Sequence, residues 1–277
     1  MARPQIVTLT TDFGLVDHFS GAMKGVMLDV FPELRIVDIT HAVQAYDVLD
    51  GALAISESYK YFPSGSVHMV VVDPGVGSAR RPILATVGEH YFVAPDNGVL
   101  SLVYQGAESV LVREITSSHY FRQPVSNTFH GRDVFAPVAA NLAKGVDPAK
   151  FGDEITDYVR FAAPSPKAAP DGSLRGIVLK IDRYGNLITN IRASDAPQMF
   201  GADPPPFRIT IGKNEVTEIY GHYAQGAPGE IFAILGSMGL LEFSTNRGNA
   251  AKLLGIGKGA EVAVRLGGAA AAGSSKG

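Results

Sequence analysis

The chain has 277 residues, a formal net charge of −3 and no cysteine. Its length predicts one large or two modest domains, and the lack of cysteine excludes disulfides, thiolate metal sites and a cysteine nucleophile. Lys and Arg are spread along the chain, so no basic stripe indicates a nucleic-acid or membrane partner. We find no signal-peptide pattern and no apolar stretch near the ~20 residues of a membrane span, so we expect a cytoplasmic protein.

The first part of the chain alternates between strand and helix patterns. Apolar, β-branched runs predict strands, and apolar residues at helical spacing predict helices. The expected strands are 5–12, 35–40, 67–73, 82–87, 91–94 and 110–115, and the expected helices are 18–31, 48–61 and 132–144. This order predicts an α/β N-terminal domain at 1–163, with a central and mainly parallel sheet covered on both faces.

The composition changes at 163–173, where APSPKAAPDGS predicts a linker at 164–173. The patterns after it are all of strand type, at 176–182, 187–191, 207–211, 215–219, 231–235, 240–243 and 260–266. Short strands separated by turns predict a small antiparallel barrel or sandwich. We assign an antiparallel β-barrel domain to 174–267 and a disordered tail to 268–277, which consists of small and polar residues.

Two clusters lie at the carboxyl ends of expected strands of the first domain, where ligands of α/β sheets collect. Asp12 in TTDFG could accept hydrogen bonds from a ribose diol or cap the next helix, and Asp17 is expected to be a cap. Asp73 begins DPGVGSARR, which matches neither the dinucleotide-binding fingerprint nor the P-loop. The alternative interpretation of this second cluster is a tight turn with two solvated arginines, Arg80 and Arg81.

Three further clusters contain polar side chains that could bind a ligand. His130 in FHGRD stands beside a glycine, which lets the backbone approach a ligand, but no histidine pair has metal-ligand spacing, so we expect no metal site. Asn186 in DRYGNLITN could read an adenine edge with Tyr184 stacking on the base, or the segment could be a plain hairpin turn. The third, GSMG with the residues that follow it, is by itself a loop between strands.

Taken together, these segments and APDNG at 94–98 resemble one family, the S-adenosylmethionine hydroxide adenosyltransferases. Those enzymes are relatives of the fluorinases and chlorinases, and the resemblance covers about residues 5–266. It implies an α/β domain followed by a β-barrel, assembled as a homotrimer with each active site between two subunits. It also implies hydrolysis of S-adenosyl-L-methionine to adenosine and methionine without a metal or an organic cofactor.

The resemblance also assigns residues. Asp73, Arg80 and His130 match the trio that activates water, in which an Asp–His pair orients the water and accepts its proton while the arginine stabilises hydroxide character. The matching substrate-binding positions are Asp12 for the ribose, Asn186 and Tyr184 for adenine, Asp182, Ser237 and Asp17 for the methionine end, and Glu242 and Asn246 as neighbours. The halogenases carry an arginine after the serine, whereas this chain has Met238, so the resemblance does not explain how the carboxylate is held.

Two other functions remain as alternatives. One is a halide-dependent adenosyltransferase, which is disfavoured because Asp73 would place a carboxylate against the incoming anion. The other is a non-catalytic S-adenosylmethionine or adenosine sensor, which would not need to activate water.

Overall fold

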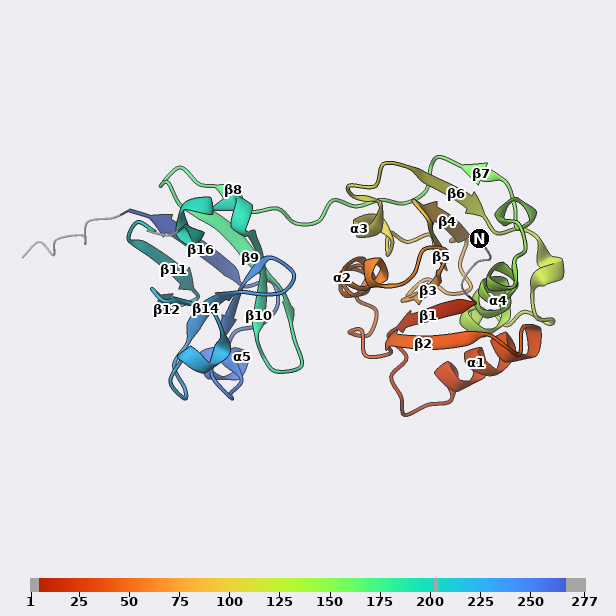
Figure 1. Cartoon of the computed structure of the whole chain (residues 1–277), viewed down its shortest axis with the longest axis horizontal. Coiled ribbons are helices and arrows are strands. Elements are labelled where there is room, and N and C mark those ends of the chain that lie inside the picture. The colour runs from red at the N-terminus through yellow and green to blue at the C-terminus, as the bar shows by residue number, and fades with distance from the viewer. Residues whose placement is uncertain (1–4, 202–203, 268–277) are drawn as a thin grey trace, which may run out of the picture. The chain divides into compact units, whose positions relative to one another are not determined.

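The computed structural model describes residues 5–201 and 204–267 of the chain, which divides into two units. The first unit is Met1–Ala162 and the second is Ala163–Gly277 (Figure 1). The segment 164–173, expected to be a linker, belongs to the second unit and contains the short strand β8, Lys167–Ala168, which pairs with β9. The expected tail 268–277 lies outside the described residues.

The first unit is built on a seven-stranded mixed sheet with the strand order β2-β1-β3-β5-β4-β6-β7. The strands are β1 Ile6–Thr11, β2 Arg35–Thr40, β3 Val67–Val71, β4 Pro82–Val87, β5 His90–Pro95, β6 Val110–Glu114 and β7 Glu154–Ile155. The parallel arrangement is confirmed for β2, β1, β3 and β5, but β4, β6 and β7 pair antiparallel. Val87 and His90 face each other across a two-residue turn, and so short a connection can join only antiparallel strands.

Helices cover both faces of this sheet, as expected. On one face α1, Phe19–Val30, and α4, Ala136–Lys144, bury Met23, Met27 and Val138 against the sheet. On the other face α2, Val48–Ser58, and the short α3, Ser101–Tyr104, pack against a second apolar cluster (Figure 1). The third expected helix starts late, because a π-helical turn, Gly131–Phe135, precedes α4 and Pro137 lies in the first turn of α4.

The second unit is a nine-stranded sheet around one apolar core. Its remaining strands are β9 Leu174–Ile181, β10 Leu187–Arg192, β11 Phe207–Ile211, β12 Asn214–Val216, β13 Ile219–Tyr220, β14 Phe232–Leu235, β15 Leu240–Ser244 and β16 Glu261–Leu266. The expected antiparallel barrel is confirmed only in part: β12 and β13 end the strand path, and within the described residues they do not pair with each other. The sheet is therefore a half-barrel, and β13 and β14 pair parallel rather than antiparallel.

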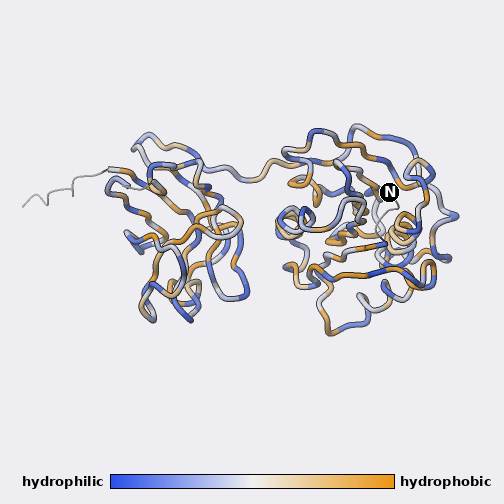
Figure 2. The backbone as a smooth tube through the Cα atoms, viewed as in Figure 1, coloured by the Kyte–Doolittle hydropathy of each residue, from blue (hydrophilic) through white to orange (hydrophobic). Residues whose placement is uncertain are grey.

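Hydropathy follows this architecture in both units. Figure 2 shows hydrophobic stretches along the strands and hydrophilic turns between them. In the first unit, Asp12 and Asp73 follow the neighbouring parallel strands β1 and β3. Both acids therefore lie at the carboxyl edge of the sheet, where open α/β folds place their ligands.

Candidate active site

The trio predicted from the sequence comes together in the first unit. Arg80 donates from Nε to Asp73 Oδ1 at 3.0 Å, and its Nη2 donates to Asp73 Oδ2 in a short hydrogen bond. The same Nη2 lies 2.8 Å from His130 Nδ1. Arg80 thus stands between the carboxylate and the imidazole, which is not the Asp–His pair that the sequence suggested. The Asp73 and Arg80 side chains are 5% and 9% exposed, so this ion pair is largely shielded from water.

The arginine fixes the tautomer of His130. A guanidinium can only donate hydrogen bonds, so His130 Nδ1 must be the acceptor and the proton of the neutral ring is on Nε2. Burial and the Arg80 charge lower the pKa of His130 below its usual value, against smaller opposing effects of Asp73 and Asp133. At neutral pH His130 is therefore a neutral ring that offers an N–H donor at Nε2.

The loop that carries His130 is held by a buried carboxylate. Asp133 has no exposed surface and accepts hydrogen bonds from Ser126 N at 2.9 Å and from Arg132 Nε at 2.7 Å. This loop also contacts the 73–81 turn directly, because Gly77 lies against the backbone carbonyl of Asn127. The backbone thus brings together two segments that are separated by about fifty residues in the sequence.

Asp12 and Asp17 lie between β1 and α1, and neither caps a helix. Asp12 Oδ2 accepts a hydrogen bond from Tyr46 N at 2.9 Å, so it ties its loop to the segment after β2. The N-cap of α1 is His18, without a side-chain capping bond, and Asp17 is exposed in the loop before it. The expectation that Asp17 caps the helix is therefore wrong.

Arg81 also differs from the expected solvated neighbour. Its side chain is 25% exposed, and Nε and Nη2 both donate to Asp96 Oδ2, at 3.1 and 2.8 Å. Nη1 donates to Asp157 Oδ1 at 2.8 Å. Because this network joins three separate segments of the first unit, Arg81 is a structural residue and not a free surface charge.

In the second unit, the turn between β9 and β10 is organised by Asp182. Its Oδ1 accepts from Tyr184 N and Asn186 N, both at 2.9 Å, and its Oδ2 accepts from Asn186 Nδ2 at 2.8 Å. Asn186 is buried, so Asp182 sets the orientation of its amide and leaves one N–H and the carbonyl oxygen for a ligand. The turn is thus a hairpin and a candidate binding element at once.

A cavity of about 640 Å³ opens beside this turn. It is lined by Asp182, Tyr184, Asn186, Tyr223, Thr245, Arg247 and Gly248. Tyr184 is 77% exposed and Tyr223 45%, so both rings have free faces on which a planar base could stack. Tyr223 and Thr245 could not be predicted from the sequence, since nothing in GHYAQG or ST distinguishes them from loop residues.

Glu242 reaches the cavity through Tyr223, with which it shares a hydrogen bond. It lies on β15 and is 5% exposed, packed closely against Gly236. Burial, with a smaller effect of the Asp182 charge, raises the pKa of Glu242 to about 7, although the bond from Tyr223 opposes the shift. Glu242 therefore supports a cavity wall, and its charge changes near neutral pH.

The two remaining predicted residues do not line the cavity. Ser237 is exposed on the turn between β14 and β15, and Met238 beside it is half-buried. Asn246 Nδ2 donates to Gly226 O at 2.9 Å, which ties down the segment that carries Tyr223. No contact of Met238 explains how the methionine carboxylate of the expected substrate would be held.

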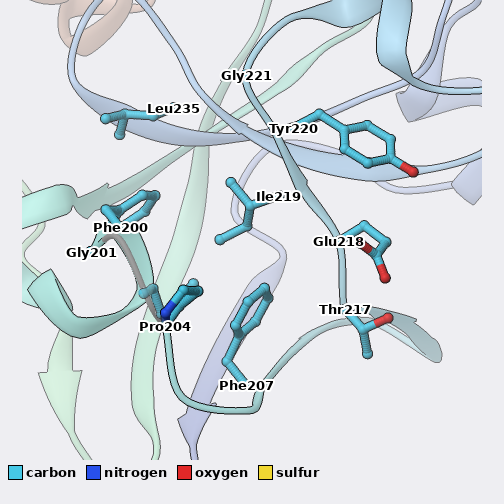
Figure 3. Close-up of a pocket in the computed structure, with 11 residues that line it drawn as sticks. Phe200, Gly201, Pro204, Phe207, Thr217, Glu218, Ile219, Tyr220, Gly221 and Leu235 are labelled. Atoms are coloured by element: carbon cyan, nitrogen blue, oxygen red, sulfur yellow. The ribbon is translucent and has the colours of Figure 1, made fainter.

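A second cavity of the same unit, of about 520 Å³, is lined mainly by residues with apolar side chains. Phe200, Pro204, Phe207 and Ile219 lie around it, with Glu218 as the charged residue of its wall (Figure 3). The described residues that line it form no cluster of titratable groups comparable to the trio, so we assign no chemistry to it. Within residues 5–201 and 204–267, no three His, Asp or Glu side chains gather in a way that could hold a metal ion.

Within the same described residues, no helix combines the length and the apolar character needed to cross a bilayer.

Comparison with known proteins agrees with this geometry. Residues 7–152 match the SAM hydroxide adenosyltransferase N-terminal domain, and residues 176–263 match the corresponding C-terminal domain. The (R)-S-adenosyl-L-methionine hydrolase of Salinispora tropica is 35% identical, covering 96% of this chain and 100% of that protein. The hydrolase of the same name from Thermus thermophilus is 36% identical, covering 92% and 98%.

More distant relatives and solved structures complete the comparison. A fluorinase of Nocardia brasiliensis is 28% identical, covering 96% of this chain and 98% of that protein. A crystal structure of an uncharacterised conserved protein from Thermotoga maritima is 33% identical and superposes with a TM-score of 0.86, covering 94% of this chain and 99% of that one.

Proposed function

We propose that this chain, which belongs to the SAM hydroxide adenosyltransferase family, hydrolyses S-adenosyl-L-methionine to adenosine and L-methionine. The observation that carries the proposal is the Asp73–Arg80–His130 centre at the carboxyl edge of the first sheet, with its largely buried Asp73–Arg80 ion pair. Water is a poor nucleophile at neutral pH, and this centre offers an acceptor, a fixed cation and an N–H donor around one point. A protein that only sensed the nucleoside would not need such an arrangement.

In the reaction, the water oxygen forms a bond to ribose C5′ while the C5′–sulfur bond breaks. The sulfonium takes the bonding electron pair and leaves as the neutral thioether of methionine, so that side needs no general acid. Asp73 accepts the proton of the water, and His130 orients the oxygen by donation from Nε2. These roles follow from the donor-only character of Arg80, which occupies His130 Nδ1.

Arg80 has one more donor to contribute. Its Nη1 is buried and makes no hydrogen bond within the described part of the chain. A buried guanidinium donor without a partner is unfavourable, and an oxygen with hydroxide character would satisfy it. Arg80 would thereby stabilise the charge that develops on the attacking oxygen.

The nucleoside would be recognised in the second unit. Asn186 offers both a donor and an acceptor to the adenine edge, and Tyr184 and Tyr223 offer rings for stacking. On the first unit Asp12 would bind the ribose diol. Asp182, Ser237 and Asp17 would hold the methionine end, and the reaction would require neither a metal nor an organic cofactor.

One assay separates this function from its alternatives. The purified protein is incubated with S-adenosyl-L-methionine, with and without chloride, and the products are separated by chromatography. We expect adenosine and methionine at a rate that does not depend on chloride. A chlorinated nucleoside would establish the halide-dependent reaction, and unchanged substrate would establish a binding protein.

The chain is further proposed to act as a homotrimer with shared active sites. The candidate groups divide between two units. The loop after Asp12 carries the exposed apolar side chains Leu15 and Val16, and Tyr46, whose backbone N donates to Asp12, is exposed as well. Apolar surface of this kind is stabilised when another surface covers it. Light scattering should give about three times the 29.3 kDa of one chain, and a fully active monomer would contradict the shared site.

Replacement of Asn186 tests the adenine site. Asn186→Ala should weaken adenosine binding by about 1–3 kcal/mol, because it leaves polar partners of the base unpaired. Calorimetric titration with adenosine measures the loss, and a thermal transition checks the fold. Asn214→Ala is the matched control, since Asn214 lies on another hairpin of the same unit, and equal affinities for both variants would contradict the assignment.

A further inference from the structure

The segment Ala94–Gly98, APDNG, contributes to the family resemblance, but the reaction described above uses none of its side chains. It begins within β5, and Asp96, the first residue after that strand, is 6% exposed. A buried carboxylate is costly unless it is paired and hydrogen-bonded. The partners of Asp96 and Asn97 therefore indicate what these residues do.

Asn97 holds the chain just before Asp73. Its Nδ2 donates to the backbone carbonyl of Val72 at 2.8 Å, and its Oδ1 accepts from Val99 N at 3.1 Å. Val72 is fully buried and immediately precedes Asp73. The amide thus fixes the peptide from which the catalytic carboxylate extends.

Asp96 holds the other end of the same turn. Its Oδ2 accepts both Nε and Nη2 of Arg81, and its backbone N donates to Arg81 O at 2.9 Å. Its Oδ1 accepts from Val159 N at 2.8 Å, so the carboxylate has fixed partners on two sides. Arg81 immediately follows Arg80, so these bonds hold the residue next to the catalytic arginine.

We propose that Asp96 and Asn97 are positioning residues, which hold the two ends of the 73–81 turn so that Arg80 reaches Asp73 and His130 together. The proposal rests on the proposed hydrolase function. The turn itself is rich in glycine and closes with few side-chain contacts, notably Ser78 Oγ to Gly75 O. The geometry of the turn therefore depends on the hydrogen bonds that hold its two ends to the rest of the domain.

The test compares Asn97→Ala and Asp96→Asn with the unchanged protein. Each variant should lower kcat by about 10- to 100-fold, because a displacement near 1 Å of a catalytic group has an effect of this size. The dissociation constant for adenosine should stay unchanged, since the groups proposed to bind adenine lie on the second unit. Turnover is measured by adenosine release at saturating substrate, beside a thermal transition for each variant.

Arg113→Ala is the matched control for lost stability. Arg113 also joins separate segments of the first unit, through Glu154 Oε1 at 2.7 Å and Gly152 O at 3.2 Å, and neither of these bonds involves the 73–81 turn. Its loss should lower the midpoint of thermal unfolding and leave kcat unchanged. Equal loss of kcat in Arg113→Ala and Asn97→Ala would overturn the positioning role.

A second measurement does not depend on activity. The ring resonances of His130, identified with His130→Ala, report its titration by NMR. In Asn97→Ala the pKa of His130 should rise toward its usual value, because Arg80 no longer lies fixed beside the ring. If the unchanged protein releases no adenosine, the hydrolase function fails, while this titration still tests the positioning. An unchanged titration together with unchanged turnover would overturn the proposal.

Discussion

Asp73→Ala and His130→Ala should each lower turnover of S-adenosyl-L-methionine by at least ~10²-fold, the usual contribution of a positioned acid or base. Asp73→Ala removes the proton acceptor and also leaves Arg80 as a buried cation without its carboxylate. His130→Ala removes the donor that orients the water. Adenosine release at saturating substrate measures both effects, and adenosine affinity should change less because the proposed adenine groups remain.

Two further variants make this prediction specific. The double replacement should be little worse than the worse single one, because groups that act as one unit are not additive. His130→Gln should lower turnover less than His130→Ala does, since the glutamine amide N–H can replace the Nε2 donor. His119→Ala is the control, an exposed histidine of the same unit, and near-normal turnover in His130→Ala would exclude the proposed mechanism.

Gly77→Ala should have the second large effect, on both folding and turnover. Gly77 has φ +76°, and an added Cβ would lie 2.2 Å from the carbonyl oxygen of Asn127. That contact is with backbone, so the 73–81 turn and the loop carrying His130 would have to separate. The free energy of unfolding should fall by more than the ~1–3 kcal/mol that the backbone conformation alone costs.

Gly88→Ala isolates the effect of close approach. Gly88 also has a positive φ, +55°, but an added Cβ would meet no atom within 4 Å. In this variant the free energy of unfolding should fall only by the ~1–3 kcal/mol that the backbone conformation costs, and turnover should stay unchanged. Chemical denaturation and adenosine release measure both variants, and equal losses in the two would mean that the contact with Asn127 is unimportant.

The sequence predicted much of the fold, because local patterns decide most of its elements. Apolar β-branched runs predicted β1, β3 and β4, and helical spacing predicted α1 and α2. The sequence could not predict that the second sheet stays open, because closure depends on how its edge strands β12 and β13 meet. It also missed the five-residue helix α5, Ala250–Leu254, which is too short for a clear periodic pattern.

The sequence by itself determined which chemical groups are present: an acid after each of two parallel strands, a histidine beside a glycine, and an asparagine in a hairpin. Only the tertiary structure decided how they act. It placed Arg80 between Asp73 and His130, which fixes the tautomer of the ring. It also paired Arg81 with the buried carboxylate of Asp96. The physical reason is that hydrogen-bond roles and burial depend on distances between segments far apart in the chain, which no local pattern contains.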